Sequence, residues 1–106
     1  MVYKIVCVCN GKCYIGMTSR SMYQRFYEHS REATANHRNR KKKRDAFHSD
    51  MKQMGLRNFK FTVLHAGLSK NEALIKEAVE IINHGSLIPN GYNISSGRKI
   101  SELANI

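Results

Sequence analysis

The stretch of sequence that decides the fold is VYKIVCVCNGKCYIGM, residues 2–17. Two runs rich in β-branched and aromatic residues flank the dipeptide Asn10-Gly11, which is the strongest short-range signal for a β-hairpin. With these two residues as the turn, alternation along the strands puts Tyr3, Tyr14 and Gly16 on one face. The sequence therefore predicts that the chain opens with an antiparallel strand pair that carries two tyrosines on one side.

The same register makes predictions about spacing within the hairpin. Gly16 lies opposite Ile5, where it would leave a gap that a phosphate could approach closely. Tyr3 and Tyr14 are four strand positions apart, or roughly 13 Å between their backbones, unless the rings lean together or the real register differs. The three cysteines are split between the two faces, which argues against a shared zinc ion, and their odd number is typical of reduced thiols in a cytosolic protein.

Two helices are predicted after the hairpin. Ser21 and Gln24 have the spacing of a capping box, and apolar residues then recur at helical intervals, which predicts a helix over about 22–33. Asp45 precedes a second amphipathic pattern that ends at Gly55.

The following part of the chain predicts a strand and a longer helix. Apolar and polar residues alternate over 58–65, which predicts a strand with one buried face. Phe59, Phe61 and Val63 occupy that face. Ser69 and Glu72 form a second capping box before a helix that reaches about residue 84. The core-facing stripe expected on this helix holds Leu74, Ile75, Ala78, Val79, Ile81 and Ile82.

Composition limits the chain to one small basic domain. It has 106 residues, 42% of them apolar, and 18 Lys and Arg against 8 Asp and Glu, a formal net charge of +10. A chain this short builds one layered core, and so large an excess of positive charge predicts a polyanionic partner. The sequence contains no run of 18 apolar residues, so it predicts no membrane-spanning helix. We divide the chain into a domain over 1–94 and a polar tail over 95–106.

A basic segment lies between the first two predicted helices. Six of the eight residues over 37–44 are Lys or Arg. Charge runs are often only solvated, but the position of this one inside the domain favours contact with a phosphate backbone. The predicted DNA-contacting residues are Arg38, Arg40, Lys41, Lys42, Lys43 and Arg44.

The order of these features resembles the GIY-YIG nuclease family, and in particular the catalytic domains of phage-type homing endonucleases. A hairpin with Tyr3 and the triplet at 14–16 precedes a helix with Arg25 and His29, and a later helix precedes the sequence Asn-Gly-Tyr-Asn at 90–93. The first triplet departs from the family pattern, because Met and Val occupy its first two positions. The resemblance implies a small α/β (α+β) GIY-YIG domain, with a central three-stranded antiparallel sheet flanked by helices.

Position by position, the resemblance implies catalytic roles for Tyr3, Tyr14, Arg25, His29 and Glu77. A tyrosine would help to deprotonate the attacking water, Arg25 would stabilise phosphoryl charge, His29 would assist proton transfer or position the phosphate, and Glu77 would hold the metal. Supporting roles fall to Lys12, Gly16, His37 and Asn93.

Physical chemistry is compatible with these assignments but does not select them all. A carboxylate-held cation, a cationic fork and a phenol can divide the tasks of phosphodiester hydrolysis. Periodicity does not distinguish Glu77 from Glu72; the family spacing does. If a tyrosine is the general base, with Tyr3 favoured over Tyr14, we expect nearby cations to lower the pKa of its phenol. His48, His65 and His84 match nothing in the family and are expected to be surface or packing residues.

The resemblance therefore implies an endodeoxyribonuclease that uses one Mg²⁺, with Mn²⁺ as a substitute, and leaves a 5′-phosphate and a 3′-hydroxyl. Two alternatives stay open: a catalytically silent nucleic-acid-binding module, and the catalytic half of a larger homing or restriction endonuclease. One site per chain predicts nicking, and monomer and homodimer are both open. The resemblance favours a phage or mobile-element protein in the cytoplasm of a bacterial cell.

Overall fold

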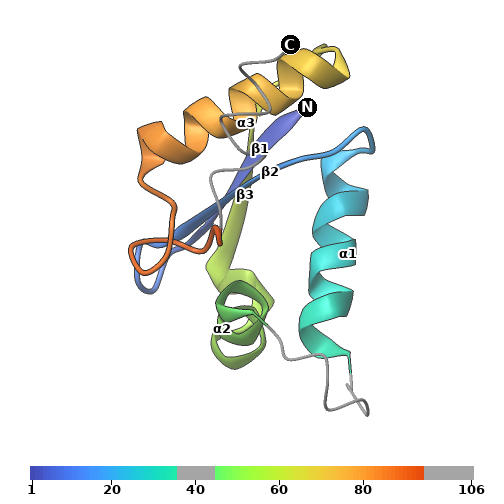
Figure 1. The fold of residues 1–106 in the computed structure, drawn as a ribbon. Coiled ribbons are helices and arrows are strands. Elements are labelled where there is room, and N and C mark those ends of the chain that lie inside the picture. The colour runs from blue at the N-terminus through green and yellow to red at the C-terminus, as the bar shows by residue number, and fades with distance from the viewer. Residues whose placement is uncertain (36–44, 95–106) are drawn as a thin grey trace.

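A computed structural model describes residues 1–35 and 45–94 of the chain. In chain order, its elements are β1 (Val2–Cys7), β2 (Cys13–Met17), α1 (Met22–Thr34), α2 (Ala46–Met54), the 3₁₀ turn η1 (Leu56–Asn58), β3 (Phe59–His65) and α3 (Lys70–His84). The strands form one antiparallel sheet in the order β2-β1-β3. Figure 1 shows α3 on one side of this sheet and α1 and α2 on the other. The predicted architecture, a three-stranded antiparallel sheet flanked by helices, is confirmed.

The hairpin register differs from the predicted one by two residues. Tyr3 faces Gly16 and Ile5 faces Tyr14, and a loop over residues 8–12 replaces the two-residue turn. A type I′ turn needs positive φ at both central residues, but only the glycine of the dipeptide has it, with φ of 75°. The amide oxygen of Asn10 instead accepts a hydrogen bond from the backbone N–H of residue 12, at 2.9 Å. A shift of two keeps every side chain on its predicted face and changes only its partners.

Two apolar clusters hold the layers together. The cluster under α1 and α2 joins Tyr3, Ile5 and Cys7 to helix residues such as Met22, Phe47 and Met51. The cluster on the opposite face joins Val2 and Ile15 to Ala73 and Ile81 of α3. Among the described residues, no helix is long and apolar enough to cross a membrane.

Side-chain caps explain where the three helices begin. The Ser21 hydroxyl accepts from the backbone N–H of Gln24, and Asp45 caps α2 in the same way through the backbone N–H of His48. At α3, both hydrogen bonds of the Ser69–Glu72 capping box are present. These caps satisfy backbone groups that the first helical turn leaves without partners, so local sequence sets the helix starts.

The predicted core positions are confirmed only in part in two elements: Phe59, Ala78 and Ile81 are buried, but other predicted residues are not. Val63 of β3 is 41% exposed, and the larger apolar residues of α3, Ile75, Val79 and Ile82, are 42%, 42% and 62% exposed. The small residues Ala73 and Ala78 face the sheet instead, together with Ile81. The apolar stripe of α3 is wider than the surface that three short strands offer, and the side with small residues lets the helix approach more closely.

Candidate active site

The corrected register brings the two hairpin tyrosines together. Their ring centroids are 6.2 Å apart. Gly16 lies beneath both rings, because a Cβ built there would overlap the Tyr3 hydroxyl and lie 2.9 Å from the Tyr14 ring. The expectation that Gly16 leaves a gap for a phosphate is therefore wrong: the phenol of Tyr3 fills that space.

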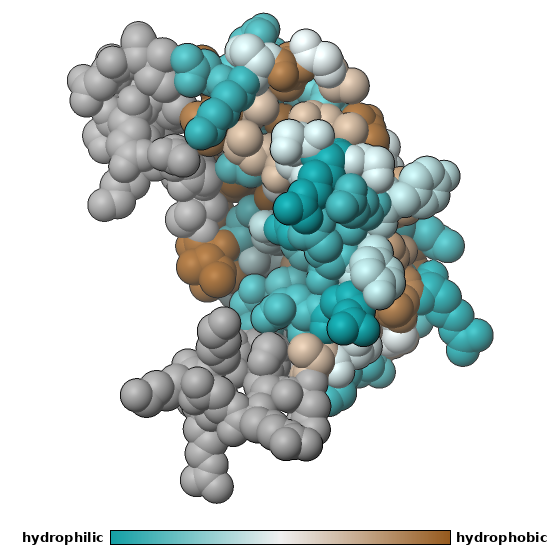
Figure 2. Space-filling view, turned by 90° about the vertical axis from the view of Figure 1, so that its right-hand side faces the viewer, coloured by the Kyte–Doolittle hydropathy of each residue, from teal (hydrophilic) through white to brown (hydrophobic). Residues whose placement is uncertain are grey.

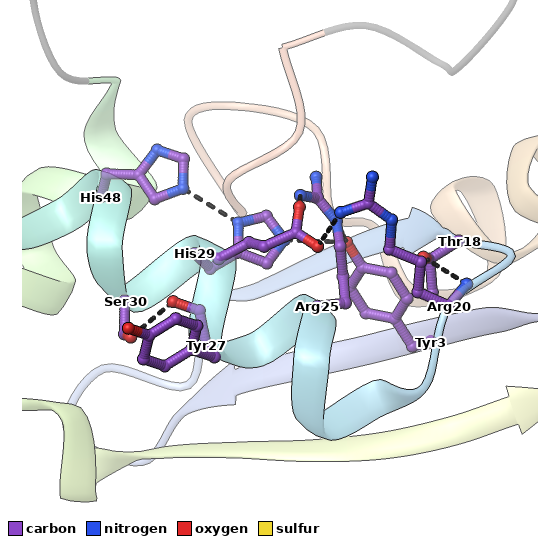
Figure 3. Close-up of polar contacts among 9 residues, drawn as sticks. Tyr3, Thr18, Arg20, Arg25, Tyr27, His29, Ser30 and His48 are labelled. Carbon is purple, nitrogen blue, oxygen red and sulfur yellow. Dashed lines mark hydrogen bonds and ion pairs between the residues drawn. The ribbon is translucent and has the colours of Figure 1, made fainter.

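A buried hydrogen-bonded cluster forms where α1 crosses the sheet. The Tyr3 hydroxyl lies 2.8 Å from His29 Nε2, and Arg25 Nε donates to the same hydroxyl at 3.3 Å. The spacing of four along α1 places both helix residues over Tyr3. Glu28 pairs with the guanidinium groups of Arg25, at 3.3 Å, and Arg20, at 2.6 Å. Figure 3 shows these side chains gathered above the sheet.

The cluster continues into α2 through two residues that the sequence analysis did not assign to the site. His29 Nδ1 lies 3.0 Å from His48 Nε2, and His48 Nδ1 lies 3.0 Å from Asp45 Oδ1. Figure 3 shows the His48 ring directed at His29. The sequence analysis expects His48 to be a surface or packing residue; its ring does pack against His29 and Phe47, and it also joins this hydrogen-bonded cluster. Its one sequence signal is its place at the third position after an N-cap aspartate, which orients it towards that carboxylate.

Burial controls the ionisation of the cluster. It raises the pKa of the Tyr3 and Tyr14 phenols above the usual 10; the Arg25 charge opposes this shift and the Glu77 charge adds to it. Burial and the nearby Arg25 charge lower the pKa of His29 to about 3. In the protein alone both phenols and His29 are therefore neutral at pH 7, because burial outweighs the lowering of the tyrosine pKa by the Arg25 charge.

A cavity of about 420 Å³ opens beside the cluster, between the sheet and α3. Tyr14, Asp45 and Glu77 are among its lining residues, whereas Tyr3 is fully buried and is not. Glu77 lies one turn from Ala73 and one turn from Ile81, so it projects from the packed side of α3. Glu72 is held in the capping box and Glu80 pairs with His84 at 3.3 Å. Of these three glutamates, the cavity-lining one is that predicted from the family spacing.

Residues 1–93 match the family model described as the GIY-YIG catalytic domain. The chain belongs to the GIY-YIG family. Members of this family are generally endonucleases that act on DNA. No match was found among curated proteins or among solved structures.

The donor set of the cavity fits a hydrated divalent cation rather than a fully protein-ligated metal. Within residues 1–35 and 45–94, no three His, Cys, Asp or Glu side chains converge as a metal cage. Mg²⁺ commonly keeps several waters and is bound through one or two carboxylates together with substrate phosphates. Glu77 at the cavity wall offers one such carboxylate in this GIY-YIG domain. A thiolate or imidazole site for zinc would need a different set of side chains.

Of the remaining predicted residues, Asn93 also lines the cavity with Tyr14 and Glu77, whereas Lys12 does not. Asn93 is buried, and its amide is used to hold β2: it accepts from Ile15 N at 2.8 Å and donates to Ile15 O at 2.8 Å. The ammonium of Lys12 lies over the Tyr92 ring, 6.0 Å from its centroid, at the far end of the hairpin from Tyr3. His37 and the basic segment over 37–44 lie outside the described residues.

Proposed function

We propose that this chain is an endodeoxyribonuclease that hydrolyses phosphodiester bonds with one divalent cation, Mg²⁺ or in its place Mn²⁺. The observation that carries the proposal is the junction of two parts. The hydrogen-bonded cluster of Tyr3, His29 and Arg25 lies on the sheet face that carries Tyr14. Tyr14 and Glu77 in turn line the cavity. The phenol of Tyr14 and the carboxylate of Glu77 belong to this cavity, and the cationic fork of Arg25 lines an adjoining one that shares Asp45 with it. Together they offer the groups that hydrolysis of a charged ester requires.

The side chains of the cavity and of the adjoining cluster take different roles, which follow from what each can donate or accept. Glu77 would hold the cation, which when bound supplies charge stabilisation to the phosphoryl and leaving oxygens. Arg25 keeps its charge, and its guanidinium, fixed at Nε by Tyr3, can neutralise a phosphate oxygen with its terminal nitrogens. Tyr14 presents its phenol to the cavity, so burial favours Tyr14 over Tyr3 as the phenol that meets the attacking water.

The surface around α1 suits a nucleic-acid partner. Figure 2 looks onto this side of the molecule and shows a mainly hydrophilic face. Arg20 and Arg31 lie exposed on or beside α1, and the formal net charge of the chain is +10. A chain with this net charge attracts a polyanion without sequence preference, since phosphate contacts position DNA rather than read its bases.

The test is plasmid nicking by a charge-matched pair of variants. Supercoiled plasmid is incubated with the protein and Mg²⁺ or EDTA, and nicked and linear products are separated on a gel. We expect cutting with Mg²⁺ and none with EDTA. Glu77→Gln should abolish cutting and leave DNA binding unchanged or slightly tighter, because one negative charge near the phosphates is removed. Glu80→Gln removes the same charge from the same helix, one turn from His84, and should cut normally.

Three outcomes would overturn the proposal or part of it. DNA binding without cutting, with Mg²⁺ or Mn²⁺ present, would make the chain a silent binding module. Cutting by Glu77→Gln at the unmutated rate would remove Glu77 as the metal ligand. Cutting that persists in EDTA would remove the cation from the mechanism.

A further inference from the structure

A continuous chain of hydrogen bonds runs through three elements, from Arg25 on α1 to Asp45 at the start of α2. Arg25 Nε meets the Tyr3 hydroxyl, this hydroxyl meets His29 Nε2, His29 Nδ1 meets His48 Nε2, and His48 Nδ1 meets Asp45. The four separations are 3.3, 2.8, 3.0 and 3.0 Å. Each ring uses both of its nitrogens, and the phenol is shared between two partners.

The chemistry of the two ends fixes the direction of every hydrogen in this chain. A guanidinium can only donate, so the Tyr3 oxygen accepts from Arg25 and its own proton is free for His29 Nε2. An ionised carboxylate can only accept, so Asp45 selects the His48 tautomer with hydrogen on Nδ1. Neutral His48 then has a bare Nε2, which accepts from His29 Nδ1–H. The Arg25 end requires a bare Nε2 on His29, and the Asp45 end requires a hydrogen on its Nδ1. Both requirements describe the same tautomer of His29.

We propose that Asp45 and His48 are positioning residues, which hold His29 in its Nδ1–H tautomer and thereby fix the Tyr3 hydroxyl and the Arg25 guanidinium that it carries. Neither residue needs to touch DNA for this role. The catalytic consequence rests on the endonuclease function proposed above, whereas the tautomer itself does not. The chain acts by orientation, and no proton has to leave Tyr3.

Two further observations support orientation rather than proton transfer. A hydrogen bond from His48 holds the pKa of Asp45 below its usual range, so this end of the chain is a carboxylate at pH 7. Burial lowers the pKa of His29 to about 3 and raises that of Tyr3, which strongly disfavours an imidazolium–phenolate pair in the protein alone. A neutral His29 ring and a neutral Tyr3 phenol, joined in a fixed direction, are the state that these shifts favour.

Asp45→Asn is the sharpest variant, because asparagine keeps the helix cap and removes the charge. Asp45 also accepts from the His48 backbone N–H at 2.9 Å, and asparagine caps a helix about as well as aspartate. Both hydrogen bonds end on Oδ1, and the neutral amide oxygen of asparagine accepts less strongly than a carboxylate, so the His48 tautomer is selected less strongly while α2 remains capped. Asp50→Asn is the matched control, since it removes the same charge from the same helix and Asp50 contacts Tyr92 and Asn10 instead.

The first measurement is independent of any nuclease activity. Long-range ¹H–¹⁵N correlation spectra at pH 8 distinguish protonated from bare ring nitrogens. We expect both His29 and His48 to carry hydrogen on Nδ1 in the unmutated protein and in Asp50→Asn. Asp45→Asn should give a mixture of tautomers or the opposite one. A hydrogen on Nε2 of His29 in the unmutated protein would overturn the inference, whether or not the protein cuts DNA.

The second measurement is the single-turnover cleavage rate beside the DNA dissociation constant. Asp45→Asn should reduce the rate by about 10- to 100-fold, as is usual when a partner that orients a functional side chain is removed, with affinity changed by less than about twofold. Asp50→Asn should keep the rate within about twofold. An unchanged rate in Asp45→Asn would overturn the positioning role. Correct tautomers in a protein that binds but does not cut would overturn the endonuclease function and leave the assignment of the chain intact.

Discussion

Protonation of His29 should make the stability of the fold depend on pH. The side chain is 3% exposed, and burial together with the Arg25 charge lowers its pKa to about 3 from an ordinary value of 6.5. Below pH 6.5 the unfolded chain binds a proton at this position that the folded protein does not bind. Folding stability is therefore fully present above about 6.5 and falls as the pH is lowered towards 3.

The size of the effect follows from the two pKa values. One pKa unit corresponds to about 1.36 kcal/mol, so the full interval is worth about 5 kcal/mol. The part between pH 6.5 and 5, where most carboxylates are still ionised, is worth about 1.5 kcal/mol. A small domain is stable by only about 5 to 15 kcal/mol, so this single ring contributes a large share of its acid sensitivity.

Urea unfolding at a series of pH values measures this directly. His29→Gln keeps a hydrogen-bonding group near Tyr3 and has no proton to gain. The quantity to compare between this variant and the unmutated protein is the change in unfolding free energy from pH 6.5 to pH 5, not the unfolding free energy itself. We expect this change to be smaller in His29→Gln than in the unmutated protein by about 1.5 kcal/mol. Equal pH dependence in the two proteins would show that His29 titrates normally, and His65→Gln, at the end of β3, is the control.

Three further predictions concern the hairpin and the basic segment. Gly16→Ala should lower the unfolding free energy by about 1 to 3 kcal/mol and slow cleavage, since the added methyl displaces the Tyr3 phenol; a thermal melt as high as that of the unmutated protein would contradict the close packing. Tyr14→Phe should lower the single-turnover rate by about 10²-fold at nearly unchanged stability, whereas Tyr3→Phe should also destabilise the fold by about 1 to 3 kcal/mol, because it removes the hydrogen-bond partner of the buried His29 Nε2 and of Arg25 Nε. Equal melting temperatures for the two would reverse this distinction. The last prediction concerns serine replacements in the basic segment, at Arg40, Lys41, Lys42 and Lys43. The slope of log binding constant against log salt concentration should become shallower by about 0.9 for each phosphate that the segment no longer neutralises. An unchanged slope would mean that the segment is only solvated.

The layers of the fold could be predicted because their signals are local. Caps at Ser21 and Ser69 mark helix starts, and alternation marks the strands, whatever lies around them. The faces of the hairpin were also predictable, since a slip of two residues preserves them. The register was not, because it depends on whether the backbone at Asn10 adopts positive φ, and an Asn side chain that bonds to the backbone offers an alternative turn.

The candidate site was less predictable than the fold, for two physical reasons. Periodicity does not distinguish Glu77 from Glu72, because the predicted apolar stripe of α3 includes Ile75 and Val79 and is too wide to show which side faces the sheet. The structure turns the alanine side of α3 to the sheet instead, with Glu77 on that side. His48 could not be assigned because its partner is 19 residues away on another helix. Helical periodicity shows which residues share a face but not which ring nitrogens meet across two helices.

The Asn93 amide also affects how the molecule behaves beside other copies of itself. β2 is the outer strand of the sheet, so its outward backbone groups could pair with a strand from another molecule. The Asn93 side chain binds both the N–H and the C=O of Ile15, and the backbone N–H of the preceding residue, Tyr92, donates to the backbone C=O of Cys13. This segment takes the place of a fourth strand along that stretch of the edge. It closes the edge to intruding chains with one side chain and one peptide group, and the same segment forms part of the cavity wall.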